Sequence, residues 1–199
     1  MAERALRADA RRNRERVLAA AAELFAESGI AVPLDDIAAR AGVGPGTVYR
    51  HFPTKEALFA AVTEARLRDL VADARSRAGA DDPGAAFDGF LARLVGEAVT
   101  KRDLPDAFAG TASGLAPLIA DLHAALDVLI RRAQQAGAVR DGIRVVDLIA
   151  LLKGLLGAVR EVDDPTVLER IGAVVRDGLR PPEESRIRLS TDPGTRRTP

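Results

Sequence analysis

The sequence contains no cysteine and no tryptophan, and aromatic residues of all kinds make up only 4% of it. Without cysteine, the chain cannot form a disulfide, a thiolate zinc site, an iron–sulfur cluster or a cysteine nucleophile. Because it also has only two histidines, a metal-sensing site is poorly supported, and we predict neither a metal nor a cofactor.

Long apolar runs are missing as well. No stretch reaches the ~20 uninterrupted apolar residues that a membrane-spanning helix requires, so we predict no contact with a membrane. The N-terminus is rich in arginine but has no apolar segment behind it, which excludes a secretory signal. A cytoplasmic protein is therefore expected.

An excess of charge of either sign is also absent, because 29 lysine and arginine residues balance 29 aspartate and glutamate residues. A net charge of zero argues against a nucleic-acid partner only when the charge is spread evenly. Here residues 1–55 carry nine basic and seven acidic groups, or +2, whereas residues 56–180 carry −3 and residues 181–199 carry +1. Binding to DNA would therefore depend on where the charges are placed.

Apolar residues recur at helical spacing along nearly the whole sequence, and no segment alternates with the two-residue period of a strand. The 199 residues suffice for one large or two small domains. Capping and helix-breaking residues divide them into about nine helices, with boundaries at Gly29, Gly42, Thr54, Asp82–Pro83, Gly137 and Asp164–Pro165. We predict an all-α protein with a flexible arm at 1–9, a first helix over 10–27 and a disordered tail at 181–199.

Residues 34–52 have the pattern of a helix-turn-helix, in which a glycine-containing turn joins two short helices. Ile37 and Ala41 would face inward, and Gly42 would adopt a positive φ at the turn. The second helix, predicted at 47–52, follows small residues that let its backbone approach a phosphate or a base edge, where the helix dipole favours negative charge. Its exposed positions would be Pro45, Gly46, Thr47, Tyr49, Arg50 and His51.

Five short motifs around this segment resemble the TetR family of bacterial transcriptional regulators. They are Phe-Ala-Glu-Ser-Gly at 25–29, Asp-Ile-Ala at 36–38, Ala-Gly-Val at 41–43, Gly-Thr-Val-Tyr-Arg-His-Phe at 46–52 and Lys-Glu-Ala-Leu at 55–58. Order, spacing and flanking helices agree over about residues 10–60. The remaining two-thirds of the chain is similar to the family only in helical layout and length.

The resemblance implies a homodimer that places one recognition helix from each subunit in successive major grooves of a palindromic double-stranded DNA operator. Thr47 and Arg50 would contact base edges, because a threonine methyl meets thymine and arginine can bridge O6 and N7 of guanine. Phosphate contacts would come from Tyr49, His51 and Lys55, and the approach would be set by Gly44, Pro45 and Gly46. The sequence departs from the family at Pro33, where a serine or threonine usually caps the second helix and touches phosphate.

By the same resemblance, residues 1–55 would form a DNA-binding domain, and residues 56–180 a domain for ligand binding and dimerisation. Residues that could line a ligand cavity, or belong to an ordinary core, are Phe87, Phe90, Leu94, Phe108, Leu118, Leu122 and His123. The last two long helices carry apolar stripes wider than one core face requires. Residues expected at or near a four-helix dimer interface are Leu148, Leu152, Leu155, Val159, Ile171 and Val175.

These features favour a repressor that an unidentified, largely apolar small molecule releases from its operator. The alternative is a DNA-organising or partner-recruiting protein of the same fold that has no inducer. A helical enzyme or carrier is the weakest hypothesis, since the sequence contains no nucleophile–base pair, glycine-rich phosphate loop or HExxH motif. Six N-terminal arginines could belong to a solvated arm or contact DNA, and the sequence does not decide between these roles: Arg4, Arg7, Arg11, Arg12, Arg14 and Arg16.

Overall fold

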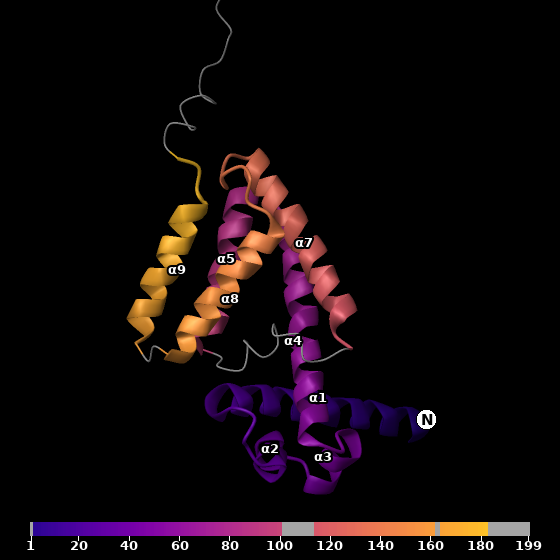
Figure 1. Cartoon of the computed structure of the whole chain (residues 1–199). Helices are drawn as coiled ribbons and strands as arrows, with labels where there is room; N and C mark the ends of the chain where they lie inside the picture. The colour runs from indigo at the N-terminus through magenta and orange to yellow at the C-terminus, as the bar shows by residue number, and fades with distance from the viewer. Residues whose placement is uncertain (1, 101–113, 162–163, 183–199) are drawn as a thin grey trace, which may run out of the picture.

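The computed structural model describes residues 2–100, 114–161 and 164–182 (Figure 1). Within these ranges the chain forms eight α-helices and no strand, which confirms the predicted all-α class. The helices are α1 (Ala2–Ser28), α2 (Leu34–Ala41), α3 (Pro45–His51), α4 (Lys55–Ala78), α5 (Pro83–Thr100), α7 (Ala116–Gln135), α8 (Val145–Glu161) and α9 (Pro165–Leu179). The short ninth piece predicted around Phe108 and the tail from 183 onward lie outside the described residues.

The helices form two parts that α4 connects. In Figure 1, α1 lies across α2 and α3 at the bottom of the molecule. From this N-terminal part, α4 rises into a C-terminal part made with α5, α7, α8 and α9, where α7 runs beside it. A movement of α4 in one part would therefore displace the residues that pack against α4 in the other.

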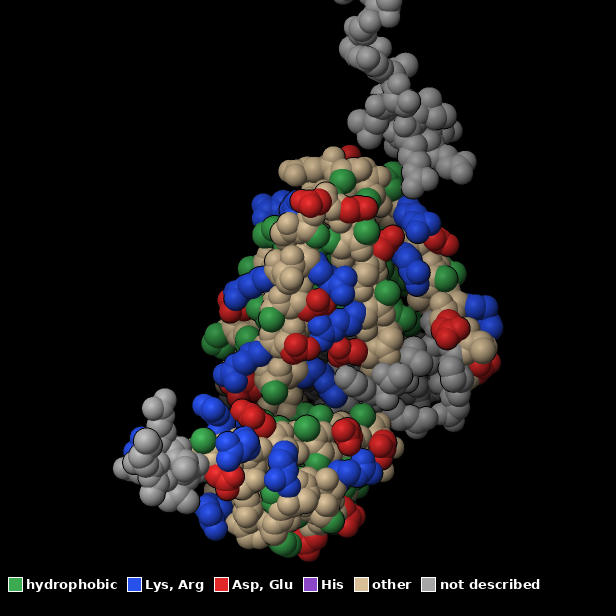
Figure 2. Space-filling view, turned by 180° about the vertical axis from the view of Figure 1, so that it is seen from behind, with side chains coloured by type: hydrophobic (Ala, Val, Ile, Leu, Met, Phe, Trp, Pro, Cys, Tyr) green, Lys and Arg blue, Asp and Glu red, His purple; other side chains and the backbone are tan. Residues whose placement is uncertain are grey.

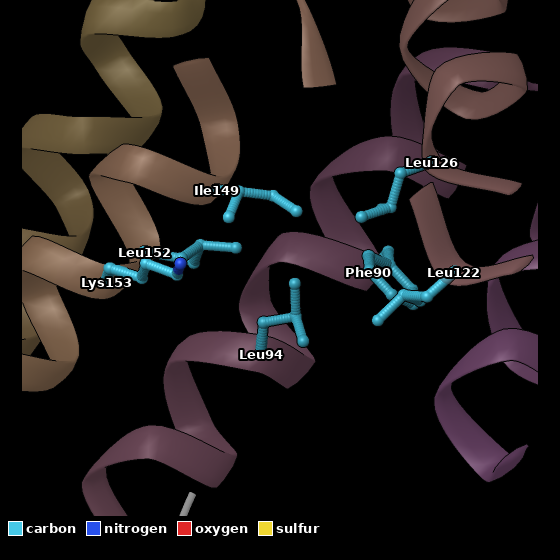
Figure 3. Close-up of a pocket in the computed structure, with 7 residues that line it drawn as sticks. All are labelled: Phe90, Leu94, Leu122, Leu126, Ile149, Leu152 and Lys153. Atoms are coloured by element: carbon cyan, nitrogen blue, oxygen red, sulfur yellow. The ribbon is translucent and has the colours of Figure 1, made fainter. Parts of the chain in front are cut away.

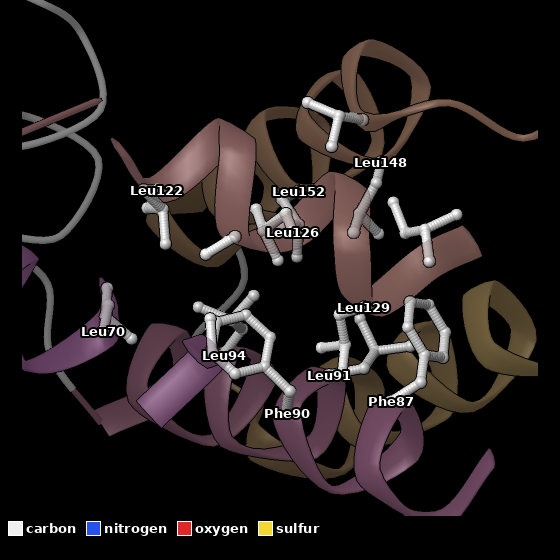
Figure 4. Close-up of a cluster of buried hydrophobic side chains, with 14 of the residues drawn as sticks. Leu70, Phe87, Phe90, Leu91, Leu94, Leu122, Leu126, Leu129, Leu148 and Leu152 are labelled. Carbon is white, nitrogen blue, oxygen red and sulfur yellow. The ribbon is translucent and has the colours of Figure 1, made fainter. Parts of the chain in front are cut away.

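Each part has its own hydrophobic core. The N-terminal core includes Val62 of α4 together with Phe25 of α1 and Ile37 of α2. The C-terminal core starts at Leu67 of α4 and is filled by leucine and phenylalanine side chains of α5, α7 and α8 (Figure 4). The N-terminal core therefore extends past the boundary predicted at residue 55 and ends within α4.

Local capping chemistry sets several helix boundaries where the sequence predicted them. The Thr54 hydroxyl oxygen accepts a hydrogen bond from the N–H of Ala57 at 3.1 Å, which starts α4. Asp164 accepts one from the N–H of Thr166 at 2.9 Å and starts α9. A hydrogen bond from the Thr166 hydroxyl is the main reason that the pKa of Asp164 is lowered. Beyond the end of α7, Gly137 has a φ of 68°.

The start of α1 differs from the prediction, because the helix begins at Ala2 instead of residue 10. Residues 2–9, predicted as a flexible arm, continue the helix in the structure. Alanine and arginine both have high helix propensity, and the pair Arg12–Asp9, one turn apart at 2.9 Å, supports this end. Apolar periodicity could not indicate the extension, since this stretch is mostly polar.

Candidate nucleic-acid interface and internal cavity

The turn between α2 and α3 is built around Gly42, whose φ of 62° is one that glycine adopts without strain. Its N–H donates to the carbonyl of Ala39 at 3.1 Å, and the N–H of Val43 donates to that of Ala38 at 3.0 Å. These bonds satisfy carbonyls that the end of α2 would otherwise leave open. The positive φ predicted for Gly42 is confirmed.

Arg16 of α1 also stabilises this turn. Its guanidinium donates to the carbonyl of Ala41 from Nε at 2.9 Å and from Nη2 at 2.5 Å, and to that of Gly42 at 2.5 Å. A cation at this end of a helix also interacts favourably with the helix dipole. From the sequence Arg16 was only one arginine of a cluster, because nothing in the pattern indicates a partner 25 residues further on.

The outer face of α3 is accessible at positions predicted to contact DNA. Tyr49 is 50% exposed and Arg50 is exposed too, whereas Thr47 and His51 are half-buried. The buried residue of this helix is Val48, which belongs to the N-terminal core. Val48 thus anchors the helix, and Tyr49 and Arg50 remain accessible to a partner.

Gly44 and Gly46, at the start of α3, are not required by the fold. Gly44 caps the helix with a φ of −70° and a ψ of 148°, which other residues also adopt. A Cβ added at either glycine would meet no described atom within 4 Å. Glycine inside a helix is less stable than alanine by about 0.5–1 kcal/mol. Together with the exposed Pro45, these glycines leave room for a partner to approach the backbone.

Lys55, predicted to contact phosphate, is half-buried at the start of α4. Its Nζ donates to the carbonyl of Ala31 at 3.1 Å and so ties α4 to the loop between α1 and α2. An ammonium has three donors, so this bond leaves others for a phosphate. Pro33 stands at the N-cap of α2 without a side-chain hydrogen bond, and the hydroxyl contact usual in the family is therefore missing here.

Three arginines fasten α4 to the C-terminal part. Arg132 of α7 donates to the carbonyl of Ala78, at the end of α4, and to that of Ala80 at 2.8 Å. Arg93 of α5 contacts Asp73 of α4 at 3.0 Å, and Arg75 of α4 lies 3.3 Å from an aspartate of α7. Burial alone would lower the pKa of Arg93, but hydrogen bonds to carboxylates raise it above its ordinary value.

A small cavity lies between α5, α7 and α8 (Figure 3). Its volume of about 10 Å³ suits roughly one water molecule. The lining residues are Phe90, Leu94, Leu122, Leu126, Ile149, Leu152 and Lys153. All except the lysine are apolar, and Lys153 is exposed, so its aliphatic stem lines the edge of the cavity.

Three of the residues predicted for a ligand cavity line this one: Phe90, Leu94 and Leu122. Phe87 is buried in the C-terminal core and Leu118 packs against it, but neither lines the cavity. His123 is half-buried and is not among the lining residues, and Phe108 lies outside the described residues. Most of the lining residues that the sequence did not indicate come from α8, whose apolar stripe had been assigned to a dimer interface.

On the outer side, α8 and α9 form an open groove of about 610 Å³. Its lining residues are Asp147, Ala150, Leu151, Gly154, Leu155, Ile171 and Val175. On the same two helices Val174 is 71% exposed and Val146 is exposed as well. The groove face of this pair is therefore largely apolar and made in part of small residues.

The residues predicted for the dimer interface fall into three groups. Leu155, Ile171 and Val175 line the groove. Leu148 and Leu152 do not line it, because they point into the C-terminal core with 1% and 7% exposure, and their place at or near a dimer interface stays a prediction. The side chain of Val159 lies outside the described residues. Because α8 is apolar on two sides, its spacing alone could not tell the inner stripe from the outer one.

Two kinds of site are absent from the part of the chain that the structure describes. It holds no group of three or more histidine, cysteine or acidic residues that could bind a metal ion. None of the described helices is long and apolar enough to cross a membrane.

A helix-turn-helix with an accessible second helix, joined through α4 to a helical part with an apolar cavity, defines a DNA-binding regulator of the helix-turn-helix class. Residues 17–62 match the family model of bacterial regulatory proteins of the tetR family, and residues 82–181 match that of the C-terminal domain of SbtR-like transcriptional regulators. The chain belongs to the TetR family of transcriptional regulators. These are non-enzymatic DNA-binding transcription factors, in agreement with the sequence-based prediction.

Solved structures of the same family are similar over almost their whole length. A TetR transcription regulatory protein from Mycobacterium vanbaalenii is 43% identical with a TM-score of 0.69, and the match covers 88% of this chain and 99% of that one. The TetR transcriptional regulator SCO0520 from Streptomyces coelicolor is 33% identical with a TM-score of 0.68, covering 84% and 98%. Among curated proteins, none matches the sequence significantly.

Proposed function

We propose that the protein is a homodimeric repressor that leaves a palindromic operator when a small, largely apolar ligand enters the C-terminal part. The observation that carries this proposal is the path of α4, which belongs to both cores and so connects the accessible helix α3 to the cavity-bearing part. In this proposal the DNA-binding unit extends to Val62, and the ligand-binding and dimerisation unit follows it.

The proposed DNA contacts divide into base edges and phosphates. Thr47 and Arg50 would enter the major groove, where an arginine that is bidentate to guanine contributes about 1–3 kcal/mol of discrimination. Tyr49, His51 and Lys55 would contact phosphates on either side. Exposure of Tyr49 and Arg50, and the remaining donors of Lys55, support these roles.

The proposed dimer would form through the groove face of α8 and α9, with a second copy of this chain as the occupant. Leu151 and Val174 are exposed there, and Ala150 and Gly154 would let a partner helix approach closely. Pairing these faces around a twofold axis would place two recognition helices on one duplex. Half-sites about 34 Å apart, one turn of DNA, would then set the required separation.

Release would follow from ligand entry between α5, α7 and α8. The cavity is too small for a ligand as it stands, so binding must part these helices and move the arginines that fasten α4. A tilt of α4 would change the separation of the two recognition helices. Coupling of this kind is typically worth about 1–3 kcal/mol. A protein of the same fold, RolR, with 22% identity and a TM-score of 0.55, has been solved with the ligand resorcinol.

Selection of bound sequences from a random DNA pool tests the DNA half of the proposal. We expect a palindrome with half-sites about one helical turn apart. A consensus without twofold symmetry, or no consensus at all, would contradict the dimeric repressor. The ligand half is tested by adding small aromatic and aliphatic compounds to the complex with the selected operator, where at least one should lower the affinity.

The second candidate is a DNA-organising or partner-recruiting protein of the same fold without an inducer. The small volume of the cavity, about 10 Å³, is the observation that favours it. This candidate predicts the same palindromic preference but an operator affinity that no compound changes. The compound screen therefore decides between the two.

Replacing Gly46 with alanine should separate DNA binding from stability. The added methyl meets no described atom in the free protein, so the melting temperature should stay equal or rise by a few degrees, as expected for about 0.5–1 kcal/mol. On DNA the methyl would stand where the backbone approaches the groove, and operator affinity should fall about 10-fold, or roughly 1.4 kcal/mol. Thermal melting and fluorescence anisotropy measure the two effects.

Gly96 in α5 offers a matched control for this substitution. A Cβ there also meets no described atom within 4 Å, so Gly96→Ala should gain similar stability. Because α5 belongs to the C-terminal part and α3 to the N-terminal part, its operator affinity should equal that of the wild type. Equal operator affinities for the wild type, Gly46→Ala and Gly96→Ala would show that Gly46 is not part of the proposed interface.

A further inference from the structure

The N-terminal half of α1 carries three exposed arginines on one side. Arg7, Arg11 and Arg14 are spaced by four and three residues, and at 100° per residue they lie within an arc of about 60°. We name them the arginine ridge. Because α1 is helical from Ala2 onward, they are held in a row of about 10 Å, at ~1.5 Å of rise per residue.

The ridge begins beside the recognition helix. The guanidinium of Arg14 lies over the ring of Phe52, 5.3 Å from its centroid. Phe52 is the C-cap of α3 and follows His51 directly. Figure 1 shows the N-terminal end of α1 projecting past α3, and Figure 2 shows Lys and Arg side chains near that end. The ridge therefore runs along α1 from a point beside the end of α3.

The contact of Arg11 with an acidic neighbour leaves its guanidinium able to bind a phosphate. Asp9 contacts Arg12, and helical geometry turns both away from the ridge. Glu15 lies 3.8 Å from Arg11, but both side chains are mostly exposed, and such surface pairs contribute little. A phosphate brought close could replace this contact.

We propose that the arginine ridge is a second DNA contact, which binds the phosphate backbone next to the groove that α3 enters. The proposal rests on the proposed function, since it takes the position of the DNA from α3. Consecutive phosphates of one strand are ~3.4 Å apart along the duplex axis and farther apart along the winding strand, so a row of about 10 Å is long enough to reach more than one of them. The contact adds affinity and salt dependence without reading sequence.

A charge-balanced chain makes such a ridge more important. The protein has no excess of basic residues to attract DNA as a whole, with 29 of each sign. Attraction must then come from a local group of cations that faces the duplex. The ridge supplies one that begins beside the C-cap of α3.

The test compares the full-length double variant R7Q/R11Q with the wild type and with R12Q. Arg14 is left in place because it also packs on Phe52. R12Q is the matched control, since Arg12 is exposed on the same helix but turned away from the ridge. Operator affinity is measured by fluorescence anisotropy as a function of KCl concentration, on the selected operator and on a random-sequence duplex of 40 base pairs. Circular dichroism checks that helix content is retained.

We expect the plot of log affinity against log salt to flatten for R7Q/R11Q by about 0.9 for each lost contact, or nearly 4 for the dimer. At intermediate salt its affinity should fall by about 10-fold or more on both duplexes, with unchanged base preference. R12Q should keep the wild-type slope. Trimming the base pairs outside the half-sites should weaken the wild type and leave R7Q/R11Q unaffected.

If R7Q/R11Q kept the wild-type salt dependence, or if R12Q lost as much operator affinity as R7Q/R11Q, the proposed contact between the arginine ridge and DNA would be overturned. The random duplex keeps this comparison valid even if no operator is found. Absence of any operator preference in the wild type would overturn the proposed function instead, so the two failures are distinguishable.

Discussion

Replacing both Leu151 and Val174 with glutamate is expected to produce monomers that bind the operator at least about 100-fold more weakly. In the proposed dimer the two substitutions would bury carboxylates against apolar side chains, and an unpaired buried charge costs several kcal/mol. Each subunit would then hold one half-site alone, and the gain of about 10²–10⁴ from linking two sites would be lost. Analytical ultracentrifugation measures the mass, and fluorescence anisotropy the affinity.

The structure allows this test without damage to the fold. Leu151 is 41% exposed and Val174 71%, so glutamate at these positions stays outside the C-terminal core. Val128 of α7, also 41% exposed, is the matched control, and Val128→Glu should remain dimeric and bind normally. If the double variant stays dimeric with unchanged operator affinity, the interface lies elsewhere than the groove of α8 and α9.

The fold could be predicted well where structure is decided by a few neighbouring residues. Thr54 starts α4 because its own hydroxyl accepts the N–H three residues on, and Gly42 ends α2 because the turn requires a positive φ. Both causes lie within a short stretch of sequence. The helix-turn-helix was therefore predictable as a unit, together with the family to which it belongs.

Contacts between distant helices could not be predicted in the same way. Leu148 and Leu151 are both apolar residues of α8, yet one is in the core and the other on the surface. Their difference arises only when α8 packs against α5 and α7. The same holds for Arg16, whose partners lie at the end of another helix, and for Lys153, which borders the cavity from α8. Such residues have no local signature.

Replacing Gly42 with valine is expected to destabilise the helix-turn-helix by roughly 3–5 kcal/mol and to abolish operator binding at moderate temperature. The left-handed backbone costs a residue with a Cβ roughly 1–2 kcal/mol. That Cβ would also lie 2.8 Å from Nη2 of Arg16, so the end of the guanidinium must shift and its hydrogen bonds to the carbonyls of Ala41 and Gly42 would weaken. Hydrogen bonds from a charged donor are worth about 1.5–3 kcal/mol. The melting temperature should fall by roughly 10 °C.

Gly29, just beyond α1, separates the two causes. Its φ of 70° is similar, but a Cβ there meets no described atom within 4 Å, so Gly29→Val should show the backbone strain alone. The excess loss at Gly42 measures the displacement of Arg16. In an Arg16→Met background that excess should disappear, because the guanidinium that the Cβ displaces is then absent. This double-mutant cycle detects coupling between groups in contact. Equal melting losses at the two glycines, or full additivity with Arg16→Met, would show that Arg16 does not hold the turn.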